Sequence, residues 1–189
     1  MTESNKKDQG ELWPAESRYE GDLVDGSMHG KGKLLFSDGK IYDGEFHEGE
    51  IHGKGKLTYP NGDFIEGDFI ESVPSGTCRW TVDMDIGAIY EGEITKGKRT
   101  GAGRLSHDHG FIIEGQFVDG EPEGEVKLIA PDGSYYLGEL KGFERHGYGK
   151  QFFENGGHFE GNFVDGKLTG HVKATLPDGT IKHIDWDNK

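Results

Sequence analysis

Apolar and polar residues alternate along this chain in short runs that are separated by glycine-containing turns. The run Tyr42-Asp43-Gly44-Glu45-Phe46 places its two rings at alternate positions, and Asp-Gly or Asn-Gly pairs follow such runs at regular intervals. Alternation over a few residues predicts half-buried β-strands, and Asp-Gly or Asn-Gly between two runs predicts a hairpin, because glycine adopts positive φ without steric cost. The 33 glycines and the lack of a sustained helical period disfavour helices. The pattern therefore predicts an all-β meander.

The alternating run recurs seven times. The units start at Tyr19, Tyr42, Ile65, Tyr90, Ile113, Tyr136 and Phe159, and their spacing is 23 residues except for 25 between Ile65 and Tyr90. Counted from 1 within a unit, positions 3 and 12 are glycine in every unit, and so is the last residue of the second turn. A fixed period of this length is typical of repeat proteins, in which each unit contacts mainly its neighbours. We therefore predict a single-layer meander of seven hairpins.

The turn lengths predict a strand register. If the first turn has two residues, at positions 7 and 8, position 5 opposes position 10, position 3 opposes 12 and position 1 opposes 14. If the second turn has three residues and ends in a glycine bulge, position 16 opposes position 1 of the next unit and position 15 opposes its position 2.

The charge pattern supports this register between units. Position 15 is basic in every unit: Lys33, Lys56, Arg79, Arg104, Lys127, Lys150 and Lys173. In five of seven cases the residue expected opposite is acidic: Asp43, Glu66, Glu91, Glu114 and Glu160. Directly opposed opposite charges stabilise a sheet by roughly 0.2–1 kcal/mol each, so this pairing is an independent argument for the register.

The other predicted face collects the aromatic rings and the glycines. We expect positions 3 and 12 to face each other and each ring to lie flat across a neighbour's glycine backbone, where no side chain competes. Such packing needs no second layer. The hydrophobic content of 32% fits a single-layer sheet better than a two-layer core.

Length and composition suggest a single cytoplasmic domain. We predict a flexible N-terminal tail at residues 1–10 and a repeat domain at 11–189, with half-repeat caps at about 11–18 and 181–186. The sequence has no long apolar run, no apolar leader segment, and one cysteine, Cys78, which cannot form an intrachain disulfide. The net charge of −14 repels nucleic acid and anionic lipid, so we expect no nucleic-acid partner.

The full motif, Y-x-G-x-F-x-x-G-x-x-x-G-x-G, resembles the MORN repeat (membrane occupation and recognition nexus). Residues 42–55 match it nearly in full, and the resemblance covers about residues 19–181. It implies an elongated, twisted antiparallel sheet. It also implies scaffold or adaptor roles in cytoskeletal and ciliary assemblies such as radial-spoke heads, at membrane contact sites, and as accessory domains of enzymes. The family carries no catalytic residues and pairs end to end, so we expect no enzyme activity, no cofactor, and a homodimer as one possible state.

Some residues depart from the motif. Position 14 is glycine in four units but Cys78, Val126 and Val172 in the others, and we expect partner specificity at these places. The third unit matches least well. Ser72 replaces its first-turn glycine, and the segment 82–86 carries two extra residues, which predicts a local bend or a protruding loop. In the sixth unit Phe143 replaces the first-turn glycine.

The aromatic column is the candidate partner-binding site. Its residues are Tyr19, Tyr42, Phe46, Tyr59, Phe69, Tyr90, Phe117, Tyr136, Phe153, Phe159 and Phe163. These rings either pack within the molecule or form a groove that grips an extended peptide or a helix. Both are compatible with a single-layer sheet, because its apolar face stays partly open.

Two other sites are weaker candidates. The basic column can bind phosphates, but the opposed acids favour charge pairing. His29, His52 and His146 share position 11 in units about 10 Å apart, too far to share an ion, whereas His107 and His109 flank a turn and can approach each other. Surface histidines remain the favoured interpretation, with no metal site.

We therefore predict a non-catalytic protein–protein interaction scaffold in a cytoskeletal or ciliary assembly. A peripheral phospholipid-binding module is one alternative, although the net charge makes a membrane partner less favoured. A regulatory subunit of an enzyme complex is the other.

Overall fold

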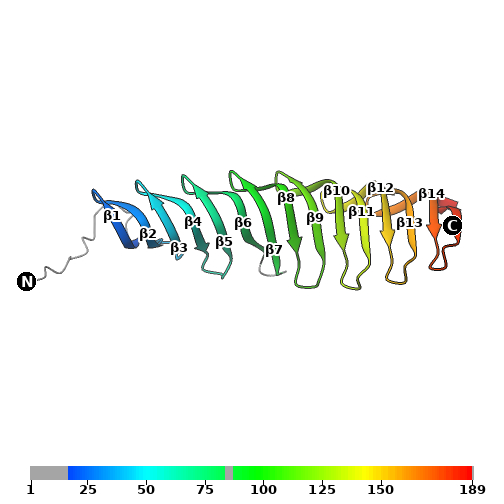
Figure 1. Cartoon of the computed structure of the whole chain (residues 1–189), viewed down its shortest axis with the longest axis horizontal. Coiled ribbons are helices and arrows are strands. Elements are labelled where there is room, and N and C mark those ends of the chain that lie inside the picture. Colours follow the sequence, from blue (N-terminus) through cyan, green and yellow to red (C-terminus); the bar gives the residue numbers. More distant parts are fainter. Residues whose placement is uncertain (1–16, 84–86, 189) are drawn as a thin grey trace, which may run out of the picture.

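The chain forms one open antiparallel sheet of 15 strands in sequence order, drawn out as an elongated ribbon (Figure 1). This computed structural model describes residues 17–83 and 87–188. The all-β, single-layer prediction is confirmed. The predicted tail at 1–10, most of the predicted N-terminal cap at 11–18, and residues 84–86 of the predicted insertion lie outside the described residues. Within those described residues, no helix has the length and apolar character needed to cross a membrane.

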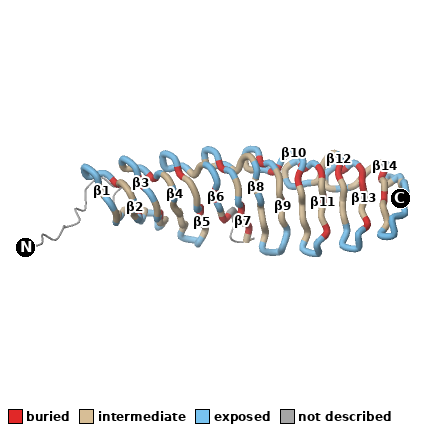
Figure 2. Tube along the Cα trace, viewed as in Figure 1, coloured by how far each residue is buried: buried red, intermediate tan, exposed pale blue. Residues whose placement is uncertain are grey.

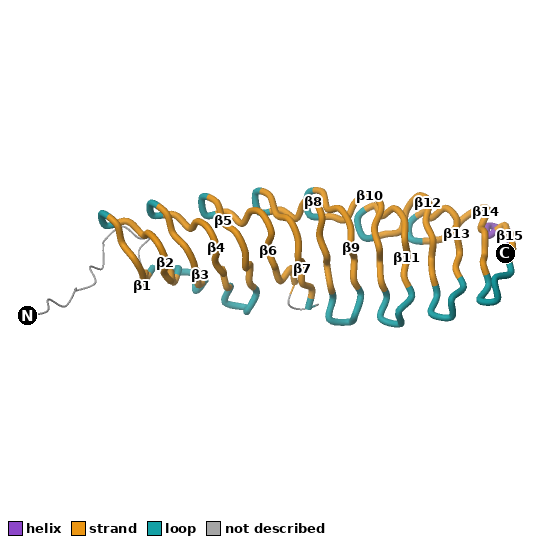
Figure 3. The backbone as a smooth tube through the Cα atoms, viewed as in Figure 1, coloured by secondary structure: helices purple, strands orange, loops and turns teal. Residues whose placement is uncertain are grey.

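The strands pair as seven hairpins followed by one more strand, and the loops lie along the two edges of the ribbon (Figure 3). A short 3₁₀ helix, η1 (Trp186–Asn188), follows the last strand. The strands are β1 (Arg18–Val24), β2 (Ser27–Leu35), β3 (Ile41–His47), β4 (Glu50–Thr58), β5 (Phe64–Ile70), β6 (Val73–Asp83), β7 (Ala88–Thr95), β8 (Lys98–Ser106), β9 (Ile112–Val118), β10 (Glu121–Ile129), β11 (Tyr135–Lys141), β12 (Glu144–Phe152), β13 (His158–Val164), β14 (Lys167–Thr175) and β15 (Ile181–Asp185).

Both kinds of turn have the predicted lengths. In the first turn of the first unit, Asp25 and Gly26 have φ of 49° and 79°, as the two central residues of a type I′ turn require. In the sixth unit Gly142, with φ of 62°, precedes Phe143, so the glycine occupies the first turn position instead of the second. In the second turn, the Phe36 nitrogen donates to the Lys40 oxygen at 2.9 Å and Gly39 has φ of 84°. This is the predicted three-residue loop with a glycine bulge.

The predicted register between units is correct. Lys33 lies opposite Asp43 and Leu34 opposite Tyr42, and the same pairing recurs along the ribbon. Four of the five predicted acid–base pairs form ion pairs, with nitrogen–oxygen distances of 3.0–3.3 Å: Lys56–Glu66, Arg79–Glu91, Arg104–Glu114 and Lys150–Glu160.

The predicted register within a unit is wrong beyond the first turn. Position 5 opposes position 10 as predicted, as in Phe46 and Ile51, but Gly44 then pairs with Gly55 at position 14 and not with Gly53 at position 12. A bulge on the second strand absorbs two residues, and Gly53 sits within it with φ of 63°. Counting from the turn cannot reveal a bulge. Because a slip of two residues keeps every side chain on its face, the predicted faces survive.

The core is a layer of rings lying over bare backbone. A Cβ added to Gly55 or to Gly44 would collide with the ring or hydroxyl of Tyr42, so the ring covers glycines of its own hairpin and not of a neighbouring unit. Tyr42 and Tyr90 are 0% exposed although the sheet has a single layer. In Figure 2 the strands are mostly of intermediate burial with short buried stretches, while the turns at both edges are exposed.

Candidate functional site

Most of the predicted aromatic column is buried inside the molecule. The ring at position 1 of one unit meets the ring at position 5 of the next edge to face, as in Tyr42–Phe69, with centroids 5.2 Å apart. The buried members are Tyr42, Phe46, Phe69, Tyr90, Phe117, Tyr136 and Phe163. Their first role is therefore packing, and they offer a partner little free surface.

The remaining predicted residues keep accessible surface. Tyr19, Tyr59 and Phe159 are partly buried, and Phe153 is 38% exposed. Phe153 and Phe159 lie edge to face at 5.1 Å near the C-terminal end of the ribbon. The accessible rings of the column thus lie in the first two and the last two repeats, and Phe153 and Phe159 form a contacting pair in the last two.

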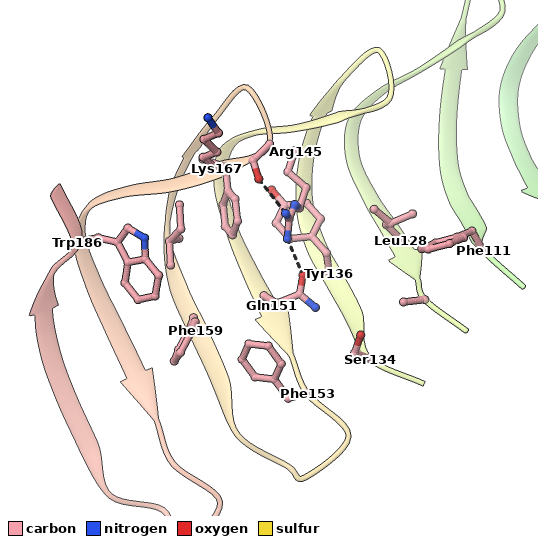
Figure 4. Close-up of a pocket in the computed structure, with 14 residues that line it drawn as sticks. Phe111, Leu128, Ser134, Tyr136, Arg145, Gln151, Phe153, Phe159, Lys167 and Trp186 are labelled. Atoms are coloured by element: carbon pink, nitrogen blue, oxygen red, sulfur yellow. Dashed lines mark hydrogen bonds between the residues drawn. The ribbon is translucent and has the colours of Figure 1, made fainter. Parts of the chain in front are cut away.

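A groove of about 620 Å³ opens at this place on the ring face (Figure 4). It extends from Phe111, which precedes β9, to Trp186 in η1. It is lined by Phe111, Leu128, Ala130, Ser134, Tyr136, Arg145, Gln151, Phe153, Phe159, Phe163, Gly166, Lys167, Leu168 and Trp186. Four residues of the predicted column, Tyr136, Phe153, Phe159 and Phe163, are among them.

Small side chains create the groove. Position 18 carries a ring in several units, such as Tyr59 and Phe153, but in the fifth unit it is Ala130. Ser134 lies beside it. The missing ring leaves a gap between Phe111, which is 49% exposed, and Phe153. The sheet face is therefore hollowed where the fifth unit carries alanine at position 18.

The floor of the groove is polar. Arg145 donates to the side-chain oxygen of Gln151 at 3.0 Å and to the carbonyl oxygen of Gly166 at 2.8 Å (Figure 4). Its guanidinium lies 5.1 Å from the ring centre of Phe163, in cation–π range. Among residues 17–83 and 87–188 no carboxylate forms an ion pair with Arg145. Its positive charge is therefore available to a ligand.

Tyr136 lines the groove, and its hydroxyl proton is shared between two backbone carbonyls of the chain itself. Its hydroxyl donates to the carbonyl oxygens of Glu139 at 3.1 Å and His146 at 3.3 Å. Burial raises the pKa of Tyr136 to about 12, so the hydroxyl keeps its proton at neutral pH. The groove combines apolar rings, a guanidinium and neutral hydrogen-bonding groups, an arrangement suited to holding a ligand.

Cys78 lies apart from the groove. It is buried on the ring face of β6. Burial raises the pKa of its thiol, which disfavours the reactive thiolate.

The basic column is occupied by acidic partners. Each base is opposed by residues on both neighbouring strands, so that Lys56 faces Asp43 in its own hairpin and Glu66 in the next. Near the end of the basic column, Glu160 accepts hydrogen bonds from Lys150 at 3.0 Å and from Lys173 at 3.1 Å. The hydrogen bond from Lys150, helped by Lys173, holds the pKa of Glu160 at about 2 despite its burial. These contacts leave little positive charge for phosphate groups.

Five of the nine histidines lie in two groups that the sequence revealed only in part. His47 on β3 lies between His29 and His52, and its ring centre is 5.1 Å from that of His29 and 5.8 Å from that of His52. The sequence comparison considered position 11 alone and therefore missed His47. His107 and His109 approach each other as predicted, with their Nδ1 atoms 3.1 Å apart.

The residues that complete the groove were missed as site residues: Phe111, Arg145, Gln151, Lys167 and Trp186. One signal was available. Trp186 falls at position 5 of the unit that would begin at residue 182, and its ring contacts Phe159 at 5.6 Å as other position-5 rings contact position 1. Arg145 and Gln151 occupy positions that are apolar in several other units, and only the structure shows them meeting.

Comparison with known proteins identifies the repeated unit. The family model described as MORN repeat matches residues 19–41, 42–64, 90–108, 114–135, 136–158 and 159–181. The third unit is not matched, yet its strands β5 and β6 pair as a hairpin. No curated protein sequence matches the chain.

Two solved structures share the fold. One is the Drosophila melanogaster SAS-4 (dCPAP) TCP domain in complex with a proline-rich motif of Ana2 (dSTIL), with 14% identity, coverage of 92% of this chain and 94% of that one, and a TM-score of 0.59. The other is the TCP10c domain of Drosophila melanogaster Sas-4, with 13% identity, coverage of 82% and 91%, and a TM-score of 0.52. At these identities the likeness shows the fold alone.

Proposed function

This chain belongs to the MORN repeat family, and from that premise we propose that it is a non-catalytic scaffold that binds an extended protein segment in the groove between Phe111 and Trp186. The observation that supports the proposal most is the combination of partly exposed rings with a guanidinium that forms no ion pair with any residue the structure describes. Phe153 and Phe159 offer apolar contact area, while Arg145 offers a charge-assisted donor. Residues 11–189 would act as one repeat domain.

Charge selects the kind of segment. The chain carries a net charge of −14. The groove nevertheless has two cationic side chains, Arg145 and Lys167, and none of the described residues that line it carries a carboxylate. We therefore propose a partner segment with proline or other apolar residues for the rings and one carboxylate for Arg145. Proline suits such a surface because an extended polyproline conformation loses little entropy on binding. The proline-rich motif bound by the SAS-4 domain of similar fold supports this choice.

The direct test uses the untagged full chain and a displayed library of random peptides. Enriched peptides are expected to contain proline or aromatic residues and at least one acidic residue, and to bind by calorimetry. Phe153→Ser and Arg145→Gln are each expected to weaken binding by roughly tenfold or more. Phe143→Ser is the matched control, because Phe143 is 52% exposed but lies in a first turn outside the groove.

Enriched peptides that bind the control and both groove variants equally would overturn the groove as the site. Failure to enrich any peptide would overturn the extended segment as the ligand. Circular dichroism of each variant separates lost binding from lost folding.

We further propose that the partner belongs to a cytoplasmic cytoskeletal or ciliary assembly, as the family resemblance implies. Proximity labelling with the full chain in its native cell type tests this, and Phe153→Ser is expected to lose the groove-dependent partner. Recovery of an enzyme would favour the regulatory-subunit alternative. Flotation with anionic liposomes would favour the membrane alternative, and analytical ultracentrifugation reports whether two chains pair.

A further inference from the structure

The second turn of the fourth unit differs chemically from its counterparts. Three other units read Tyr59-Pro60-Asn61-Gly62, Ala130-Pro131-Asp132-Gly133 and Leu176-Pro177-Asp178-Gly179, whereas the fourth reads His107-Asp108-His109-Gly110. In those three turns the Asn or Asp side chain accepts from the backbone nitrogen two residues on, as Asp132 does from Ser134 at 2.9 Å. His109 stands in the place of that carboxylate or amide. The turn keeps its shape but gives up proline and its usual hydrogen-bonding cap.

The replacement brings three potential metal ligands together. The Nδ1 atoms of His107 and His109 are 3.1 Å apart, and Asp108 Oδ1 lies 3.0 Å from the first and 2.6 Å from the second. Ligand atoms around a tetrahedral zinc ion with bonds of 2.0–2.1 Å are separated by about 3.3 Å. A small opening of the cluster would therefore give room for an ion at its centre.

The cluster contains more hydrogen-bond acceptors than donors. The backbone nitrogen of His109 donates to His107 Nδ1 at 3.1 Å, so this atom presents a lone pair. The same atom also lies 3.0 Å from the carboxylate oxygen of Asp108, which is another acceptor. A proton on His109 Nδ1 serves only one of its neighbours. A cation that replaces the backbone N–H as the partner of His107 Nδ1 would relieve the opposed lone pairs.

We propose that His107, Asp108 and His109 bind a late first-row divalent cation such as Zn²⁺. Two imidazole nitrogens and one carboxylate suit such ions, whereas Mg²⁺ and Ca²⁺ prefer all-oxygen ligands. Three consecutive residues in one tight turn form a short, preorganised chelate, and the fourth coordination position faces solvent because His109 is 73% exposed.

Gly87 of the third unit packs against Asp108. A Cβ added to Gly87 would lie 2.7 Å from Asp108 Cβ, Cγ and Oδ2, so the carboxylate rests against bare backbone. The turn itself is closed by the His107 nitrogen, which donates to the Phe111 oxygen at 2.8 Å, as in the other second turns. The site is built by two neighbouring turns and is independent of the proposed peptide ligand.

The test is calorimetry of the untagged full chain with ZnCl₂. We expect saturable binding of one ion per chain at the cluster, and at least tenfold weaker binding of MgCl₂ or CaCl₂. The key variant is His107→Tyr/His109→Asn, which installs the residues that the second unit carries at Tyr59 and Asn61. It should therefore fold at least as well as the natural chain while its affinity for zinc falls at least tenfold. Gly87→Ala should weaken zinc binding without changing any ligand.

The matched control is His29→Asn/His47→Asn, which removes two other neighbouring histidines and should leave this binding unchanged. The proposal is overturned if the chain binds no zinc, if the His107→Tyr/His109→Asn variant binds as tightly as the natural chain, or if the control variant abolishes the binding. Equal affinity for Mg²⁺ would also overturn it, because nitrogen ligands would then play no part.

Discussion

The ring of Tyr42 lies directly over the backbone of Gly55. A Cβ on Gly55 would collide with the hydroxyl and ring carbons of Tyr42, and the hydroxyl donates to the carbonyl oxygen of Glu45 at 3.2 Å, beside the bulge. The same contact recurs in Tyr90, which covers Gly103 and donates to Glu93 at 2.9 Å. One side chain thus covers the sheet and satisfies a carbonyl at its bulge.

This contact explains which units carry glycine at position 14. Glycine is present wherever position 1 is tyrosine, in the first, second, fourth and sixth units. Where position 1 is Ile65, Ile113 or Phe159, position 14 is Cys78, Val126 or Val172. In the fifth unit Val126 fills the space over Gly115 that a tyrosine hydroxyl fills elsewhere. The departures that the sequence suggested for partner specificity therefore have a packing reason.

The first prediction is that Tyr42 and Gly55 are energetically coupled. Gly55→Val should destabilise the chain by about 1–3 kcal/mol, because the new methyl groups displace the Tyr42 ring. Tyr42→Ile should also destabilise it, because a fully buried ring is lost. The double variant recreates the Ile113–Val126 combination, so its cost should fall short of the sum by about 1–3 kcal/mol. Urea unfolding of the four proteins measures this coupling, and costs that simply add would contradict it.

The sequence predicted the sheet well and the groove poorly, for physical reasons. Turn residues such as Asp25-Gly26 determine local geometry, and the opposed charges of Lys56 and Glu66 report a neighbouring strand, so strand order and the register between units followed directly. The bulge at Gly53 depends on backbone conformation within a strand, where no turn signal marks it. The groove depends on how Arg145 and Gln151 meet across the sheet and on a ring missing at Ala130, relationships that no local pattern encodes.

The second prediction concerns Glu160, whose side chain is only 9% exposed. Its pKa in the folded chain is lowered from 4.5 to about 2, so its contribution to stability is present above pH 4.5 and is lost as the pH falls towards 2. Glu160→Gln should lower the free energy of unfolding at neutral pH by about 1–2 kcal/mol. The difference from the natural chain should vanish near pH 2.

Denaturant unfolding across this pH range measures the effect. Glu114→Gln is the control, because Glu114 pairs with Arg104 while 44% exposed, and a solvated pair of this kind contributes about 0–1 kcal/mol. A Glu160→Gln difference that stays constant down to pH 2 would show that the carboxylate is not the source of the stability.

The third prediction concerns alkaline pH. Burial raises the pKa of Tyr42, Tyr90 and Tyr136 to about 12 from the ordinary 10.0. Because the folded pKa lies above the unfolded one, the stability they contribute is complete below pH 10 and is lost as the pH rises towards 12. Ultraviolet titration should show three tyrosines that ionise late while the chain stays folded. Tyr90→Phe should remove one of them, and full ionisation near pH 10 in a folded chain would refute the prediction.

The fourth prediction is that Trp186 caps the last repeat. Its ring meets Phe159 at 5.6 Å, in the place that a position-5 ring takes elsewhere, and the neighbouring Asp187 accepts from the Gly170 nitrogen at 2.9 Å. Trp186→Ala should remove about 1–3 kcal/mol of local stability, because it uncovers Phe159 and the end of the ribbon. In a repeat array each unit is stabilised by its neighbours, so the loss should stay near the end.

Hydrogen exchange resolved along the chain checks this. Amides of β13 to β15 should exchange faster in Trp186→Ala, while those of β7 and β8 should keep their protection. Ile181→Ala, on the last strand β15 just before η1, is the matched control, because Ile181 is 53% exposed and its truncation uncovers little. If Trp186→Ala accelerates exchange equally along the whole ribbon, the repeats unfold as one cooperative unit and the tryptophan stabilises all of them. If exchange at β13 to β15 is unchanged, the ring is a groove-lining residue with no capping role.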